Sequence, residues 1–325
     1  MTIGLVIACM LLLPSAAAAG SKVDKLKDQG NSPGQYRKIL EEIIDEGDAA
    51  IPDLASLLEE PAPADEIDRK KQWMIKVAAM DLVAELKAKD ALAILENLLV
   101  NSENLSAIFN SARTIGRIGG NQAYKILEDA LENARNGEYT QTADRKRAIV
   151  MAMGLCGDGK AIPYLATEME NPENEMILRV YAAGSLGMLE DGQGLGLALA
   201  ALDSDDPYLR TAAIRSLGVI GSAQSIPALT AIVENGTLLG HHQEIRLALA
   251  QIEAAQLDGD DRVNFVRNQL KSHPKETLFL RWGTEKLKNI NSAASKKALE
   301  DLGAETDPEL EILADTARIK FKAMK

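Results

Sequence analysis

The sequence predicts an all-α protein in which helical hairpins stack into an array. The first observation is a Leu-Gly line that recurs around Gly116, Gly154, Gly187 and Gly218, at steps of 38, 33 and 31 residues. A self-match at this period indicates a solenoid of stacked units, each of which is one supersecondary element. The second observation is a composition dominated by Ala and Leu, with only 4% aromatic residues, which favours helices over strands.

Each predicted hairpin consists of a first helix, a turn and a second helix. Several first helices begin with an Ile-Pro pair, at Ile51, Ile162 and Ile226. Proline is tolerated there because the first turn of a helix leaves its N–H groups unpaired in any case. Second helices often follow an Asp-Pro or Asn-Pro pair, which is typical of a capped helix start. The predicted pairs span residues 48–87, 90–119, 121–157, 160–190, 191–221, 222–256, 259–290 and 292–324, after a single helix at 35–46.

The predicted array covers residues 33–325, and its ends differ from its middle. Residues 88–256 carry the repeat signature, whereas 33–87 and 257–325 lack it. We interpret these flanks as atypical or capping repeats, which commonly close such arrays. Residues 20–32 are polar and short of apolar anchors, so we expect a linker there.

Residues 1–19 have the features of a secretory signal peptide. An apolar run from Ile3 to Leu13 precedes a stretch of small residues of the kind found at cleavage sites. The run is too short to span a bilayer, which takes about 20 apolar residues. We therefore expect an exported bacterial protein, periplasmic or extracellular, with no integral membrane segment in the mature chain. The alternative is an outer-membrane lipoprotein, because the four residues ending at Cys9 are similar to a lipobox.

The charge of the chain restricts its partners. The formal net charge is −12, and binding to a phosphate backbone requires a cationic footprint, so a nucleic-acid partner is not expected. The exception is the end of the chain, because residues 262–325 carry more Lys and Arg than Asp and Glu. The sequence therefore leaves a protein as the expected partner, without identifying it.

Two segments carry a family resemblance. Residues 161–192, which end in AAGSLGMLEDG, and residues 206–229, which begin with DPYLRTAAIRSLG, resemble HEAT repeats of the short type first noted in phycobilisome lyases. The resemblance implies a right-handed α/α superhelix of about seven to eight HEAT-like hairpins. It also implies a protein-binding role, because HEAT arrays serve mostly as scaffolds for other proteins. The lyase-type members attach or detach a chromophore on a partner protein.

A series of basic residues recurs in phase with the glycines. Alignment on the glycines places Lys146, Arg179 and Arg210 at one position early in each second helix, and Arg246 follows by local pattern. The family resemblance implies a ladder of charges between stacked repeats. The functional alternative is a stripe on the concave face that binds an acidic peptide. Both interpretations stay open at this point.

Three further residues are candidates for partner binding. Trp282 belongs to a residue type favoured in binding hot spots. His241 and His242 lie in an unusual loop, but adjacent residues on a helix point about 100° apart, which makes them a poor metal pair. No HExxH or CxxC motif is present, so no metal site is expected.

The sequence shows no constellation for catalysis. It contains neither a Gly-x-Ser-x-Gly elbow nor a phosphate-binding P-loop, and no cofactor is expected. We therefore predict a non-catalytic protein-binding scaffold of the bacterial cell envelope, which presents a curved helical surface to its partner. The alternatives are a lyase-like enzyme or chaperone acting on a partner protein, and a lipid-anchored envelope scaffold.

Overall fold

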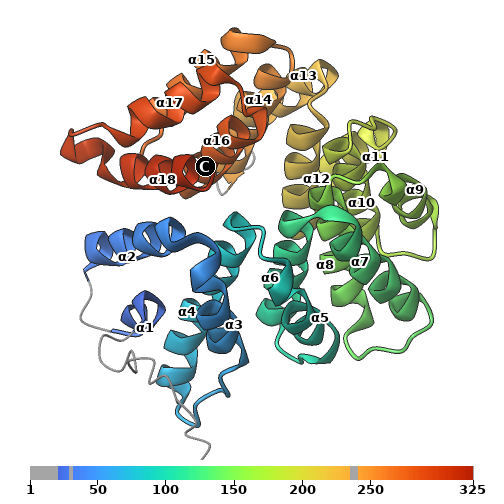
Figure 1. Cartoon of the computed structure of the whole chain (residues 1–325). Helices are drawn as coiled ribbons and strands as arrows, with labels where there is room; N and C mark the ends of the chain where they lie inside the picture. Colours follow the sequence, from blue (N-terminus) through green and yellow to red (C-terminus); the bar gives the residue numbers. More distant parts are fainter. Residues whose placement is uncertain (1–20, 29–31, 235–240, 325) are drawn as a thin grey trace, which may run out of the picture.

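A computed structural model describes residues 21–28, 32–234 and 241–324, and every regular element in these ranges is a helix. The predicted all-α class is therefore confirmed (Figure 1). The predicted signal peptide, including Cys9, lies outside the described residues. Within the described ranges, no helix combines the length and the apolar character that crossing a bilayer requires.

The helices form the predicted succession of pairs. Before them come α1 (Lys22–Lys25) and α2 (Pro33–Glu46). The pairs are α3 (Ile51–Glu59) with α4 (Glu66–Glu85), α5 (Leu92–Asn101) with α6 (Leu105–Ile118), α7 (Gly120–Arg135) with α8 (Thr142–Cys156), α9 (Ile162–Glu170) with α10 (Met176–Met188), α11 (Leu195–Ala200) with α12 (Pro207–Ile220), α13 (Ile226–Glu234) with α14 (His242–Ala255), α15 (Gly259–Ser272) with α16 (Thr277–Ile290), and α17 (Ala293–Gly303) with α18 (Glu311–Lys322). Short 3-10 turns precede several first helices, at Gly47–Ala50, Lys89–Ala91, Gly159–Ala161 and Ala223–Ser225, and two others lie at Ala201–Asp203 and Pro308–Leu310.

The Ile-Pro pairs start first helices, as predicted. Ile51, Ile162 and Ile226 are each the first residue of α3, α9 and α13, and a proline follows directly in each. The Asp-Pro pair at Asp206 caps the start of α12, as predicted. The Asp206 side chain accepts a hydrogen bond of 2.8 Å from the N–H of Tyr208. The local sequence signals thus decide where these helices begin.

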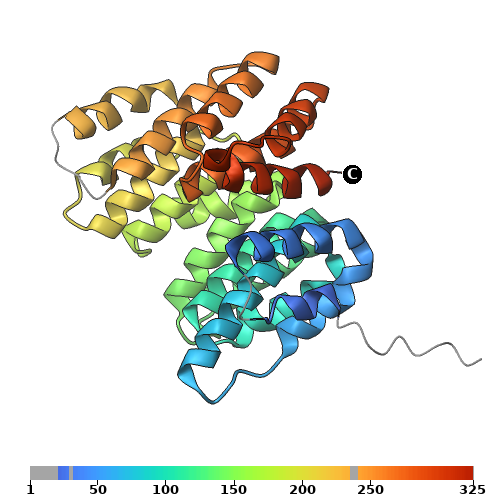
Figure 2. The ribbon, with the colours of Figure 1, turned by 90° about the vertical axis from the view of Figure 1, so that its left-hand side faces the viewer.

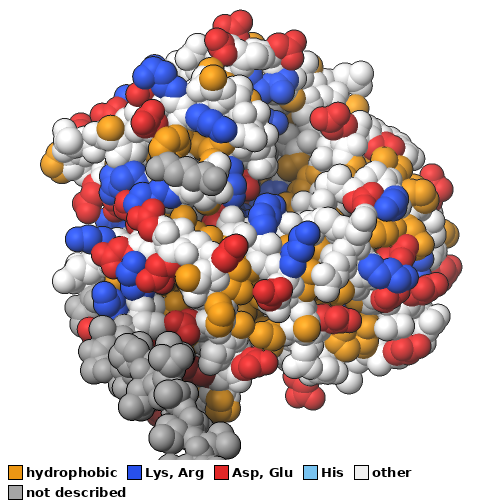
Figure 3. All heavy atoms as spheres, in the orientation of Figure 1, with side chains coloured by type: hydrophobic (Ala, Val, Ile, Leu, Met, Phe, Trp, Pro, Cys, Tyr) orange, Lys and Arg blue, Asp and Glu red, His pale blue; other side chains and the backbone are white. Residues whose placement is uncertain are grey.

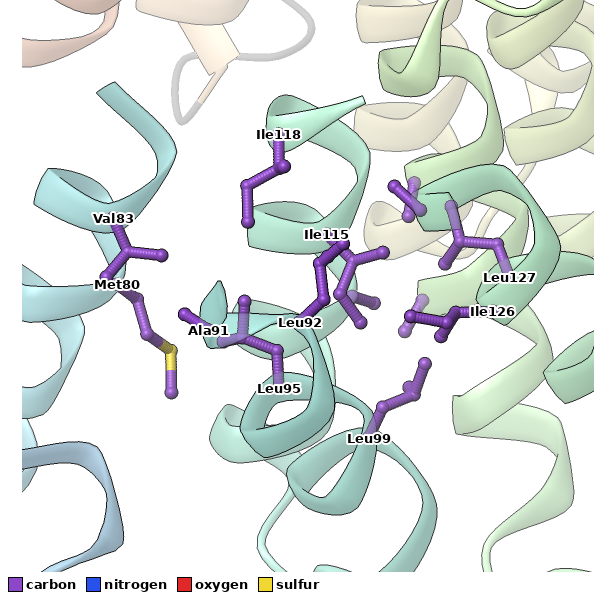
Figure 4. Close-up of a cluster of buried hydrophobic side chains, with 14 of the residues drawn as sticks. Met80, Val83, Ala91, Leu92, Leu95, Leu99, Ile115, Ile118, Ile126 and Leu127 are labelled. Carbon is purple, nitrogen blue, oxygen red and sulfur yellow. The ribbon is translucent and has the colours of Figure 1, made fainter. Parts of the chain in front are cut away.

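Apolar stripes of neighbouring helices build the core. In α3 the side chains of Leu54, Leu57 and Leu58 are at most 2% exposed. Figure 4 shows the same kind of packing further along, where Met80 of α4 and Leu95 of α5 meet residues of α6 and α7. Apolar clusters of this kind continue through the repeats, so each repeat buries its own stripe against its neighbours.

The recurrent glycines are places where successive second helices touch. A Cβ atom on Gly116 of α6 would lie 2.4 Å from the carbonyl oxygen of Ala152 in α8. One on Gly154 would lie 2.8 Å from the Cα atom of Ser185 in α10. Both distances are shorter than a side chain tolerates, so the glycines permit the close stacking of α6, α8 and α10.

The array curls until its two ends meet. Figure 1 and Figure 2 show α18 next to α2, and the two helices are in contact. α16 packs against α18 and so lies near this junction. The last pair therefore returns to the first helices, and the second helices line a partly enclosed centre.

The expected linker at 20–32 is wrong in its first part. Residues 22–25 form α1, and Val23 and Leu26 are each 2% exposed within the first apolar cluster. Nζ of Lys22 also lies 3.0 Å from a carboxylate oxygen of Glu46. Two apolar residues spaced three apart are enough to anchor one helical turn, a signal too short to stand out from a polar segment.

Candidate functional site at the centre of the closed array

Two of the predicted basic residues hold carbonyl groups at helix ends. Nε of Arg179 donates a hydrogen bond of 2.7 Å to the carbonyl of Met169, near the end of α9. A terminal nitrogen of Arg210 donates one of 2.5 Å to the carbonyl of Ser204, which follows the 3-10 turn after α11. The last carbonyls of a helix lack partners and carry partial negative charge, so a guanidinium there stabilises the helix end.

Two residues that the glycine alignment does not single out have the same role. Nζ of Lys76 donates a hydrogen bond of 2.8 Å to the carbonyl of Leu58 in α3. The guanidinium of Arg145, which is 1% exposed, donates one of 3.0 Å to the carbonyl of Val100 in α5. Burial lowers the pKa of both side chains, and the carbonyl contacts compensate for the lost water.

The other two members of the predicted series face carboxylates. Nζ of Lys146 lies 3.9 Å from Glu168 of α9. A terminal nitrogen of Arg246 lies 3.0 Å from Glu276, at the start of α16. Each contact joins one repeat to the next. The four predicted positions therefore do not share one environment.

The remaining candidates are dispersed. Nδ1 of His241 lies 3.2 Å from the hydroxyl of Thr211, and His242 is the first residue of α14. Trp282 packs edge-on against Phe279, with ring centroids 6.3 Å apart, within the last apolar cluster. Among the residues that the structure describes, no group of three His, Cys, Asp or Glu side chains is arranged to hold a metal.

A buried carboxylate marks the place where the ends of the array meet. Glu85 of α4 forms ion pairs with Arg117 of α6, Lys288 of α16 and Lys320 of α18, and its side chain is only 6% exposed. Burial alone would raise the pKa of Glu85, but the charges of Lys320, Arg117 and Lys288 hold it well below its usual range. Glu85 therefore stays ionised and ties α4 to three other helices.

A second set of ion pairs joins α2 to α18. Nε of Arg318 lies 3.2 Å from Glu41, and Nζ of Lys322 lies 2.7 Å from the other oxygen of the same carboxylate. On the neighbouring turn, Arg37 pairs with Glu311 at 3.0 Å and with Asp315. We call these contacts, together with those of Glu85, the closure interface.

Arginines of separate repeats gather beside the closure interface. Arg113 and Arg117 of α6 share one carboxylate oxygen of Asp81 in α4, at 3.0 Å and 2.8 Å. Arg281 of α16 lies near enough to interact electrostatically with this group, and also with Arg215 of α12. We call the four residues Arg113, Arg117, Arg215 and Arg281 the central arginine cluster.

Arg281 is the member of the central arginine cluster without a direct partner. Within the described ranges it makes no hydrogen bond and no ion pair within 4 Å, although its side chain is exposed. Desolvation lowers its pKa, the charges of Arg113, Arg117 and Arg215 lower it further, and Asp81 acts in the opposite direction. Exposure combined with desolvation is expected for a side chain in a concave surface.

Figure 3 shows a hollow in the surface of the molecule. The surface is hollowed between the C-terminal helices at the top of the view and the repeats on the right, and Lys and Arg side chains lie at its margin. A guanidinium stays protonated at neutral pH, so the members of the central arginine cluster are positively charged, although the whole chain has a net charge of −12.

Sequence analysis missed this site. The sequence contains two pairs of like-charged residues, each pair spaced four residues apart. Asp81 and Glu85 form the acidic pair, and Arg113 and Arg117 form the basic pair. Like charges at this spacing weakly destabilise an isolated helix, and nothing in the local pattern shows that the acidic pair faces the basic one. These pairs become a site only because the array closes and brings α16 opposite α4 and α6.

Comparison with known proteins gives a family and a relative. The profile of HEAT repeats matches residues 162–250. Phycocyanobilin lyase subunit alpha of Synechococcus elongatus is 37% identical to this chain over 65 residues, which is 20% of this chain and 24% of that protein. The match therefore spans about a quarter of the length of this relative.

Two solved structures are similar in part. One is the complex of CpcE and CpcF of phycocyanin lyase from a Nostoc species, with a TM-score of 0.49, 17% identity, and coverage of 78% of this chain and 96% of that chain. The other is human deoxyhypusine hydroxylase in complex with glycerol, with a TM-score of 0.38, 15% identity, and coverage of 86% and 97%. The HEAT-repeat profile thus matches the middle of an array of stacked helical pairs.

Proposed function

We propose that this chain is a non-catalytic scaffold of the bacterial cell envelope that presents the inner face of its array to a protein partner. The observation that carries the proposal is the central arginine cluster, whose members come from α6, α12 and α16. Stacked repeats offer extended concave surfaces, and complementary charge fixes the orientation of a partner on such a surface.

Apolar side chains on the neighbouring repeats extend this surface. Leu155 of α8 and Met188 of α10 are each 39% exposed. Each follows its repeat glycine by one residue, as Arg117 follows Gly116. The same phase on stacked helices places them on the same side as Arg117. The inner face therefore combines apolar and cationic surface, which suits a protein segment better than a simple ion.

The test of the scaffold function is capture followed by reconstitution. The mature chain, immobilised, is exposed to envelope extract at physiological salt, and a retained protein is identified, produced separately and titrated by calorimetry. We expect a stoichiometric complex that Arg281→Glu weakens. The proposal is wrong if no protein is retained, or if substitutions of Leu155 and Met188 as well as of Arg281 all leave the affinity of the reconstituted complex unchanged.

The envelope location rests on residues 1–19. We expect removal of these residues in the producing cell, and the intact mass of the purified protein would then match a chain that begins near residue 19 or 20. A chain that begins at an acylated Cys9 would show the alternative, a lipid-anchored scaffold. A mass that retains all residues would contradict export by either route.

A lyase-like role is the second candidate, favoured by the similarity over 65 residues to a phycocyanobilin lyase subunit. The chain is incubated with phycocyanobilin and the phycocyanin apoprotein, and covalently bound chromophore is measured after denaturation. Chromophore attached only in the presence of the chain would establish this role. Attachment at the spontaneous rate would exclude it for this substrate pair.

A further inference from the structure

We propose that the central arginine cluster recognises an acidic segment of the partner protein, in which carboxylates alternate with apolar side chains. This inference rests on the scaffold function and specifies the chemistry of the partner. It is carried by the free donor groups of the cluster, by its arrangement over several repeats, and by the apolar surface between its members.

The cluster retains donor groups that no neighbour uses. Among the described residues, Arg281 has no hydrogen bond and no ion pair, and its side chain is exposed. Arg215 is 55% exposed, and its ion-pair partner within the described residues is Glu244, at 3.3 Å. A guanidinium offers planar pairs of N–H donors that match the two oxygens of a carboxylate. The cluster can therefore bind more than one carboxylate.

Neighbouring guanidinium groups repel one another, and a bound anion relieves this repulsion. Asp81 is shared by Arg113 and Arg117, so its single charge is already engaged. Arg281 approaches these residues without a carboxylate of its own, and the lowering of its pKa by the other arginines is a consequence of that proximity. Carboxylates entering the hollow would compensate the excess positive charge.

The spacing of the cluster points to an extended ligand. α6 and α12 do not pack directly in succession, because α8 and α10 lie between them along the stack. Leu155 of α8 and Met188 of α10 supply exposed apolar surface in this interval. A ligand that follows the stack from α6 to α12 therefore has apolar surface within reach. An acidic segment with interspersed apolar side chains meets both requirements.

The experiment measures binding of a defined probe to the full mature chain. The probe is a fluorescein-labelled peptide of Glu residues interspersed with Leu, and its anisotropy is followed at low ionic strength. We expect binding that weakens as salt is raised. Arg281→Gln should weaken binding about tenfold or more, because one charge-assisted bidentate contact is lost. Arg281→Lys should retain part of the affinity.

The matched control is Lys297→Gln, on the exposed outer helix α17. This substitution changes the net charge by the same amount as Arg281→Gln. The Lys297 side chain is 72% exposed, and its ion-pair partner within the described residues is Asp301 of the same helix. Unchanged affinity in this variant supports a local site. Equal weakening by both variants would overturn the proposal, because the peptide would then be sensing only the net charge.

Competition experiments test which class of ligand the central arginine cluster binds. Free glutamate and inorganic phosphate should compete only weakly, since neither spans the cluster, and a Lys-Leu peptide should not bind. Competition by phosphate as strong as that by the unlabelled peptide would overturn the assignment to a protein segment. Circular dichroism and thermal melting of each variant establish that the fold is retained.

The two proposals fail in different ways. If Arg281→Gln captures the partner as well as the unaltered chain does and the Glu-Leu peptide does not bind, the site is wrong and the scaffold function stands. If the peptide binds in an Arg281-dependent manner and no protein is captured, the site is supported and the scaffold function is wrong.

Discussion

Nζ of Lys288 donates a hydrogen bond of 2.6 Å to the carboxylate of Glu85, although 203 residues separate the two in the sequence. Glu85 belongs to the first helical pair and Lys288 to the pair before the last. In an open solenoid each repeat touches only its neighbours. This contact shows that the array is closed, and it adjoins the central arginine cluster through Arg117, which pairs with the same carboxylate.

The variant Glu85→Gln should destabilise the fold by about 3–5 kcal/mol, because three buried or half-buried cations lose their shared carboxylate. Chemical unfolding followed by circular dichroism measures this loss. The matched control is Glu300→Gln on α17, which is exposed, and it should change the stability by less than about 0.5 kcal/mol. Similar losses in the two variants would contradict the role of Glu85.

The contribution of Glu85 should depend on pH in a defined direction. Its pKa in the folded chain lies below the unfolded value of about 4.5, so the ionised carboxylate stabilises the fold fully above that value. The contribution is lost as the pH falls through the lower folded pKa. Stability measured from pH 6 downwards should therefore decline less steeply in Glu85→Gln than in the unaltered chain.

Closure should respond to salt and to charge reversal at α2. Arg37 contacts Asp315 and Glu311 of α18, and Arg37→Glu replaces attraction by repulsion there. Small-angle X-ray scattering should show a larger radius of gyration in this variant, while the helical content stays the same. High salt should expand the unaltered chain in the same direction, because screening weakens ion pairs that are partly exposed. Lys297→Glu should leave the radius unchanged.

Two glycine substitutions should change the stability of the fold in opposite directions. Gly116→Ala places a Cβ atom against the backbone of Ala152 and should destabilise the fold by about 1–3 kcal/mol. Gly196→Ala, inside α11, meets no atom within 4 Å and should stabilise by up to about 1 kcal/mol through helix propensity. Thermal melting distinguishes these results, and equal effects would contradict the close approach of α6 and α8.

Arg179→Ala should reduce stability without reducing partner affinity. Its hydrogen bond of 2.7 Å to the carbonyl of Met169 is charge-assisted, so we expect a loss of about 1.5–3 kcal/mol. The control Arg147→Ala removes a pair with Asp144 on the same helix, which contributes at most about 0.5 kcal/mol. The affinity for the labelled Glu-Leu peptide, measured by anisotropy, should be the same in both variants. Weaker peptide binding in Arg179→Ala would instead favour the predicted concave stripe.

Local signals made the helical pairs predictable. The start of α3 at Ile51 follows from the proline behind it, and the stacking of α6 on α8 follows from the phase of Gly116 and Gly154. Each signal acts over one or two helical turns, so a single sequence contains it completely. The short helix α1 was missed because Val23 and Leu26 are too few to form a pattern.

The sequence by itself determined that this is a periodic helical array, where its hairpins lie, and that basic residues recur early in the second helices. Only the tertiary structure decided that Arg179 holds a helix end while Arg281 lies close to arginines of other repeats. The reason is physical. The curvature of the array accumulates from small rotations between repeats, and no local pattern records whether their sum brings α16 and α18 back to α2 and α4.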